Sequence, residues 1–125
     1  MAKKKINSTS AMFADIIVKG IQEKKGKSIT VMNLANVQNS MFDYFIICEG
    51  NSRTQTEAIA DSVQEEVRKA IGVTPRFKEG FINSEWILLD YFDIVVHIFQ
   101  KEARSFYQLE KLWSDADIKI IEDID

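Results

Sequence analysis

Apolar residues recur at helical spacing in three parts of the chain, which cover residues 8–25, 52–71 and 102–113. Ser8 or Ser10 suits the N-cap of the first part, and Ser52 suits that of the second. The apolar stripes are Phe13, Ile16, Ile17, Gly20 and Ile21; Ile59, Val63, Val67 and Ile71; and Phe106, Leu109, Leu112 and Trp113. We therefore expect three amphipathic helices, each burying one face.

Five further stretches have the composition and spacing of β-strands: residues 28–34, 43–49, 74–78, 85–90 and 93–99. Stretch 43–49 is almost continuously apolar and ends at Gly50, which is typical of a central strand covered on both faces. Only Tyr91 and Phe92 separate the last two stretches, which predicts a tight antiparallel hairpin.

The order of these elements is helix, two strands, helix, three strands, helix. Alternation of this kind, with a hairpin at its end, predicts an α+β fold in which a single mixed β-sheet of about five strands is packed with helices. Ile118, Ile120 and Ile121 near the end of the chain could add an edge strand or a short turn.

Length and composition restrict the class of protein. The 125 residues suit one domain, and 46% hydrophobic with 28% charged residues is ordinary for a soluble globular chain. We divide it into a short basic arm (1–9), a folded domain (10–114) and an acidic tail (115–125). No apolar run reaches the ~20 residues of a membrane helix, and a lone Cys48 favours a cytoplasmic location.

The charge is unevenly distributed. Residues 1–27 carry seven Lys against two acidic residues, whereas the remainder carries 17 acidic and 9 basic residues. Such an acidic body suits a basic protein surface better than nucleic-acid phosphates, so we expect no sequence-specific nucleic-acid binding. The triplet Lys3-Lys4-Lys5 is interpreted as a solvated arm, and a weak contact with RNA stays open.

Catalytic chemistry finds little support. One His and one Cys do not suffice for a zinc site of nitrogen and sulfur ligands, and no phosphate-binding or dinucleotide-binding glycine motif is present, so no cofactor or metal is expected. Asp90 and Asp93 are three residues apart and flank a turn, whereas paired magnesium ligands usually lie two apart on one strand. Cys48 lies within a strand and is interpreted as a small hydrophobic residue, and Gly50-Asn51-Ser52 before a helix is a weak anion-binding signal.

The predicted hairpin holds the candidate binding residues. Strand alternation places Trp86, Leu88 and Asp90 on one face and Ile87 with Leu89 on the other. On the second strand, Val95, His97 and Phe99 share the face of Trp86, while Ile94, Val96 and Ile98 join the aliphatic face, which must be core.

The face of Trp86 combines a Trp, a carboxylate and the single His, which is unusual for a protein core. We therefore interpret it as a partner-binding face. Trp86 would be its anchor and Asp90 would meet a basic group of the partner. The alternative is structural: Trp86 covers a helix and His97 is a hydrogen-bonded residue of the sheet.

Several motifs together resemble a known family. They are Asp43-Tyr44-Phe45-Ile46-Ile47; Gly50, Ser52, Gln55 and Ala58-Ile59-Ala60-Asp61; Glu79-Gly80; the block from Trp86 to Phe99; and Arg104, Phe106, Tyr107, Leu109, Glu110, Leu112 and Trp113. In these positions the chain resembles the Iojap family of ribosomal silencing factors over residues 10–114. Phe92 stands where that family commonly has Gly, and Ser84 where a small Ala is usual.

The resemblance implies a nucleotidyltransferase-like fold that lacks the catalytic residues, and therefore no enzyme. It also implies a translational repressor that binds the large ribosomal subunit through ribosomal protein number fourteen, blocks joining of the small subunit and damps translation during starvation or stationary phase. The family's partner-facing motif falls on Trp86, Leu88 and Asp90.

Two other hypotheses stay open: a nucleotidyltransferase-like enzyme, and an RNA-binding adaptor that uses the basic arm. A homodimer is also allowed, formed at a sheet edge or on the apolar side of the Trp86 face.

Overall fold

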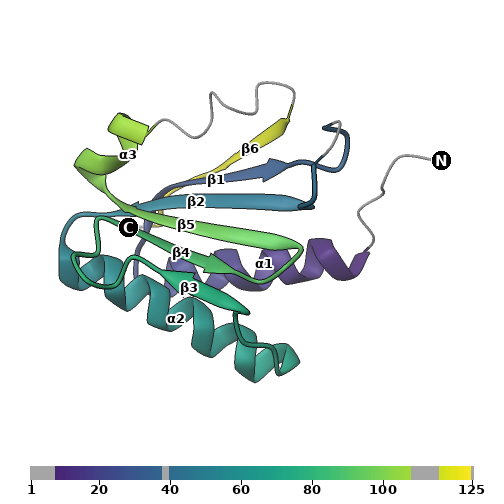
Figure 1. Ribbon diagram of the computed structural model, residues 1–125, viewed down its shortest axis with the longest axis horizontal. Helices are drawn as coiled ribbons and strands as arrows, with labels where there is room; N and C mark the ends of the chain where they lie inside the picture. Colours follow the sequence, from purple (N-terminus) through teal and green to yellow (C-terminus); the bar gives the residue numbers. More distant parts are fainter. Residues whose placement is uncertain (1–7, 38–39, 108–115, 125) are drawn as a thin grey trace.

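A computed structural model describes residues 8–37, 40–107 and 116–124, with the side chains of residues 8, 9 and 105–107 left out. Its elements in chain order are α1 (Ser8–Glu23), β1 (Lys27–Asn33), β2 (Tyr44–Gly50), α2 (Arg53–Ile71), β3 (Phe77–Glu79), β4 (Trp86–Asp90), β5 (Ile94–Gln100), α3 (Lys101–Tyr107) and β6 (Asp117–Ile121) (Figure 1). None of the described helices is both long and apolar enough to cross a membrane.

The strands form one open sheet in the order β3-β4-β5-β2-β1-β6 (Figure 1). β2 and β5 run parallel at its centre, and the other neighbouring pairs of the described sheet are antiparallel. The predicted α+β fold with a single mixed sheet is confirmed, but the sheet has six strands rather than five. The added strand is β6, which pairs with β1, so residues 117–121 belong to the sheet.

α1 and α2 lie together on one face of the sheet (Figure 1). They approach closely where a Cβ on Gly20 would come within 2.9 Å of the Cα of Val63. There the Ser62 hydroxyl donates a hydrogen bond of 2.7 Å to the Gly20 carbonyl. The predicted ends of α2 are confirmed, since Ser52 Oγ accepts from the Gln55 amide and Gly72 adopts a left-handed conformation with φ +69°.

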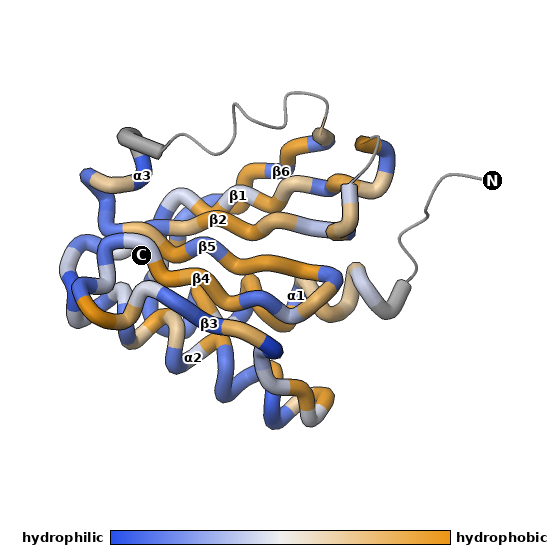
Figure 2. The backbone as a smooth tube through the Cα atoms, viewed as in Figure 1, coloured by the Kyte–Doolittle hydropathy of each residue, from blue (hydrophilic) through white to orange (hydrophobic). Residues whose placement is uncertain are grey.

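The main core lies between these helices and the sheet. Its fully buried members include Ile17, Ile21, Ile59, Val63, Ile87, Leu89, Ile94, Val96 and Ile98. Figure 2 shows the hydrophobic positions concentrated along β2, β5 and β4. The aliphatic face predicted from the hairpin is therefore core.

The opposite face of the sheet carries a second hydrophobic cluster, which we call the second cluster. Its buried members are Met32, Leu34, Phe45, Ile47, Val95 and Phe99. The expectation that a core would not choose the face of Trp86 is therefore wrong for its central part. The reason is that β2 and β5 occupy the middle of the sheet, so both of their faces are covered.

Several boundaries differ from the sequence-based expectation by one or more residues. β3 begins at Phe77, later than residue 74, and α3 begins at Lys101, one residue before residue 102. Beyond Tyr107 the predicted third helix, including the inward placement of its apolar stripe, lies outside the described residues and side chains. In the hairpin, Tyr91 still donates to the Ile94 carbonyl, so the tip of the turn is formed by Phe92 and Asp93 rather than by Tyr91 and Phe92.

Candidate functional site

β4 positions the candidate binding residues by simple alternation. Ile87 and Leu89 are fully buried under α2, whereas Trp86, Leu88 and Asp90 are half-buried on the opposite face. The register places these three beside Phe99, His97 and Val95 of β5. The predicted separation of the two faces is confirmed.

Trp86 is held in place by two neighbours on β5. Its indole stacks on the Phe99 ring, with 5.1 Å between centroids and 25° between the planes. Its Nε1–H donates a hydrogen bond of 3.1 Å to His97 Nδ1. The orientation of the indole is therefore fixed by the sheet, which limits the side-chain entropy that a partner contact would cost.

For His97 the structural interpretation holds, because its side chain is a hydrogen-bonded part of the sheet. It is 4% exposed, and the Phe45 ring meets it edge-on at 4.8 Å. Burial lowers the pKa of His97 to about 4, so the imidazole is neutral at pH 7. Because Nδ1 accepts from Trp86, the proton lies on Nε2, which has no hydrogen-bond partner among the described residues.

Asp90 is engaged within the chain. Its Oδ1 accepts from the Phe92 amide at 2.8 Å and lies 3.2 Å from Arg76 Nε. The backbone amide of Arg76 also donates to the Asp90 carbonyl. Asp90 thus organises the hairpin tip through both its carboxylate and its backbone carbonyl.

The hairpin tip has an unusual backbone. Phe92 has φ +85°. On either side of it, the Asp93 amide donates a hydrogen bond of 3.1 Å to the Tyr91 carbonyl, two residues earlier in the chain. A bond of this span with a positive φ at its centre is the pattern of a γ-turn, a strained conformation for a residue with a side chain. Phe92 occupies the position where the resembling family commonly has Gly, a residue that adopts a positive φ without strain.

The loop before β4 is fixed by short contacts. Gly80 has φ +97°, and a Cβ there would overlap the Trp86 carbonyl oxygen. Ser84, also at positive φ and fully buried, donates from its hydroxyl to Glu57 Oε2 at 2.6 Å. Arg53 at the start of α2 donates to the carbonyl of Ile82. These contacts fix where β4, and therefore Trp86, begins.

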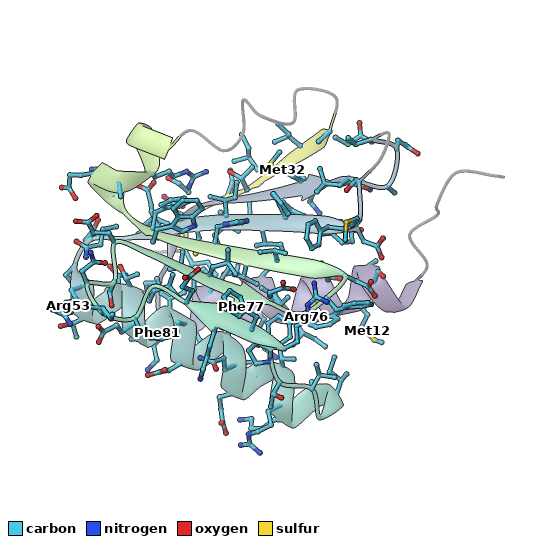
Figure 3. The ribbon with its side chains drawn as sticks, in the orientation of Figure 1. Met12, Met32, Arg53, Arg76, Phe77 and Phe81 are labelled. Atoms are coloured by element: carbon cyan, nitrogen blue, oxygen red, sulfur yellow. The ribbon has the colours of Figure 1, made fainter. Side chains whose placement is uncertain are left out.

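Sequence reasoning missed two side chains next to this face. Phe77 pairs with Asp90 across β3 and β4, and Arg76 precedes it (Figure 3). The Arg76 guanidinium lies 4.5 Å from the centroid of the Phe92 ring. Arg76 and Phe77 are more than ten residues from Asp90 and Phe92 in the sequence, so local pattern does not show that they lie together. The one local sign is an aromatic residue in a short stretch of strand type.

Arg104 of α3 has a role that the pattern did not reveal. Its guanidinium donates to the Ser28 carbonyl, to Thr30 Oγ1 at 2.8 Å and to Glu49 Oε1 at 3.5 Å. The side chains of Arg104 and Glu49 are only 12% and 14% exposed. Arg104 therefore ties the start of α3 to β1 and β2 beside the second cluster.

The residues considered for catalysis do not come together. Cys48 is fully buried, and desolvation raises the pKa of its thiol far above the ordinary range, as expected of a small hydrophobic residue. Asp93 lies in the tip of the turn, and Asp90 Oδ1 is bonded to Arg76 and to the Phe92 amide. Within the described residues, no group of three or more His, Cys, Asp or Glu side chains could hold a metal ion.

The fold and the site define a class: a small α+β domain with one helix-covered face and one aromatic-rich face. Residues 7–125 match the family described as "Ribosomal silencing factor during starvation". The chain therefore belongs to the family of ribosomal silencing factors, to which the Iojap proteins are also related.

Individual relatives agree with this assignment. The chain is 37% identical over 101 residues to the ribosomal silencing factor RsfS of Halalkalibacterium halodurans, covering 81% of this chain and 85% of that protein. It is 38% identical over 96 residues to the Bacillus subtilis protein of the same name, covering 77% and 80%. The chloroplastic protein Iojap of Arabidopsis thaliana is 34% identical over 74 residues, which is 58% of this chain and 30% of that protein.

Solved structures show the same fold. A crystal structure of a Chromobacterium violaceum protein superposes with a TM-score of 0.78 at 32% identity, covering 83% of this chain and 85% of that one. A crystal structure of a Bacillus halodurans protein gives a TM-score of 0.72 at 30% identity, covering 92% and 98%.

Proposed function

We propose that this protein is a non-catalytic translational repressor of the cytoplasm that binds the large ribosomal subunit through ribosomal protein number fourteen. By occupying that surface it blocks joining of the small subunit and damps translation during starvation or stationary phase. Membership in the ribosomal silencing factor family supports association with the ribosome.

The observation that carries the proposal is the geometry of Trp86. A half-buried indole held by Phe99 and His97 is a preorganised aromatic anchor, and Trp is prominent among the residues that dominate binding energy at interfaces. Leu88 extends its apolar surface along β4, and Asp90 follows with its carboxylate bonded to Arg76. The excess of acidic residues beyond residue 27 supports a basic partner.

The proposal assigns the partner contact to residues 10–114, with Trp86, Leu88 and Asp90 at its centre. The basic arm of residues 1–9 is not needed in it. This assignment separates the protein from an RNA-binding adaptor, whose affinity would come from Lys side chains and fall steeply with salt.

Sedimentation of ribosomal subunits tests the proposal. The protein should co-migrate with the large subunit and reduce the formation of joined ribosomes. Trp86→Ala should weaken large-subunit binding by about 2 kcal/mol or more, the scale of an interface hot spot. Binding is measured at a temperature at which circular dichroism shows the variant folded, because Trp86 also contacts Phe99.

Ile87→Ala is the control from the other face of the same strand. It should cost about 2–5 kcal/mol of folding stability by opening a core cavity, while folded protein binds normally. Co-migration with the small subunit alone, or equal loss of binding by folded Ile87→Ala, would contradict the proposal.

A further inference from the structure

Two large aromatic side chains are exposed at the end of the Trp86 face. Phe77 is 51% and Phe92 is 61% exposed, although both surround the half-buried Asp90. Phe77 is the ladder partner of Asp90, and Phe92 donates its amide to the Asp90 carboxylate. Leu88 and Trp86 follow on the same face of β4, so the exposed aromatic surface continues directly from the proposed contact.

The fold gains little from Phe92. Its backbone is held at φ +85°, which is costly for a residue with a Cβ, and its ring remains mostly in solvent. The described contact of the ring is the Arg76 guanidinium at 4.5 Å, an exposed cation–π pair of modest strength. A strained backbone that presents an aromatic ring to water points to a use outside the fold.

Phe77 presents a similar case. It belongs to a three-residue edge strand in which every residue is exposed, a position where a large apolar side chain favours unwanted association. It lies beside Arg76 at the beginning of β3 (Figure 3). An apolar group at such an edge is better explained by a partner that covers it.

The charges around the two rings indicate the kind of partner. Glu79 pairs with Leu88 on the ladder, and Asp93 adjoins Phe92 at the tip. Both are exposed, and neither has an ion pair within the part of the chain that the structure describes. Glu79, Asp90 and Asp93 together bring three negative charges to this surface, against the one positive charge of Arg76. The surface around the two rings is therefore acidic and suits a protein surface that carries Lys or Arg.

We propose that Phe77 and Phe92 form an aromatic extension of the Trp86 face, which docks on a basic protein surface of the large subunit. This inference rests on the proposed function and adds two contact residues to it. The Asp90–Arg76 pair then acts as a positioning unit, because it holds the hairpin tip and stacks the guanidinium on one side of the Phe92 ring.

The test compares Phe92→Gly, Phe77→Ser and Trp86→Ala with the wild type in binding to large subunits and to purified ribosomal protein number fourteen. Protein-free ribosomal RNA is a third probe. Ile120→Ser is the matched control, because Ile120 is 75% exposed on β6 at the opposite edge of the sheet. Phe92→Gly and Phe77→Ser should each weaken binding to both protein-containing probes by about tenfold, whereas Ile120→Ser should not.

A measurement of thermal stability distinguishes the proposed partner-binding role of Phe92 from a purely structural role. Phe92→Gly should melt at the wild-type temperature or above it, because glycine accepts a positive φ without strain. Wild-type affinity of both Phe variants, with Trp86→Ala still impaired, would overturn the extension and leave the proposed function standing. Failure of the wild type to bind large subunits would instead overturn both.

Two other outcomes would also overturn the extension. Phe variants that lose affinity only for ribosomal RNA would assign the surface to nucleic acid. Phe variants that change the sedimentation of the free protein, without altering subunit binding, would assign it to a second copy of the chain.

Discussion

His97 has one ring nitrogen bonded and one without a partner. Nδ1 accepts the indole N–H of Trp86, while Nε2 lies buried without an acceptor among the described residues. A buried group in this state stays neutral, because protonation would place a charge between Phe45 and the sheet. The same burial that orients Trp86 therefore makes the fold sensitive to acid.

Acid should destabilise the protein through His97. Its folded pKa of about 4 lies below the ordinary value of 6.5, so the unfolded chain takes up the proton first. The stability is fully present above pH 6.5, falls between pH 6.5 and 4, and loses about 3 kcal/mol in all. Urea unfolding across this range measures the effect.

His97→Asn is the control, because the Asn side-chain oxygen can accept from the indole in place of Nδ1 but does not titrate. Carboxylates contribute to acid unfolding in both proteins, so the difference between the two curves isolates His97. Parallel curves for the wild type and His97→Asn would show that the imidazole is not held neutral by the fold.

Among the elements, the crossing of α1 and α2 determines how the helix layer covers the sheet. The two helices approach at Gly20 and Val63, and the Ser62 hydroxyl bonds to the Gly20 carbonyl across the contact. Ile21 and Val67 are fully buried in the same layer. A side chain at residue 20 would separate the helices and lift both from the strands that carry Ile87 and Leu89.

Gly20→Val should therefore destabilise the fold by about 2 kcal/mol or more, through overpacking against the backbone of α2. Lys19→Ala, at the neighbouring exposed position of α1, should change the stability by no more than about 0.5 kcal/mol. Thermal and urea unfolding of the two variants measure the contrast. An unchanged midpoint for Gly20→Val would mean that the helices can move apart without loss.

The whole molecule combines a basic first segment with an acidic remainder. Residues 1–27 hold seven of the 16 basic side chains and only two of the 19 acidic ones. The Trp86 face and its aromatic extension lie at the β3–β4 side of the sheet. A binding module that uses this face needs no phosphate contacts from the arm.

Removal of residues 2–6 should leave large-subunit affinity within about twofold of the wild type, since the proposed contact lies on β4 and exposed lysine charges contribute little to binding energy. The dependence of binding on salt should also stay the same. A loss of affinity together with a shallower salt dependence would favour the RNA-binding adaptor, because each lost phosphate contact lowers the slope.

Local pattern determined much of the architecture from the sequence alone. The stripe from Ile59 to Ile71 predicted α2, and the alternation of Ile87 and Leu89 with Trp86 and Leu88 predicted which side of β4 is buried. Such patterns are informative where an element has one covered face, because burial then follows the period of the backbone. For the turn, the only advance sign was that the resembling family commonly has Gly where Phe92 stands.

Only the tertiary structure decided what depends on pairing between distant segments. β5 is buried on both faces, so its alternation gave no warning that Val95 and Phe99 would join a second cluster with Phe45 of β2, or that His97 would pack edge-on against Phe45. Likewise, the β3–β4 ladder places Phe77 next to Asp90, and the hairpin turn places Phe92 next to the same residue. Strand register arises from contacts between remote residues, which no local period encodes.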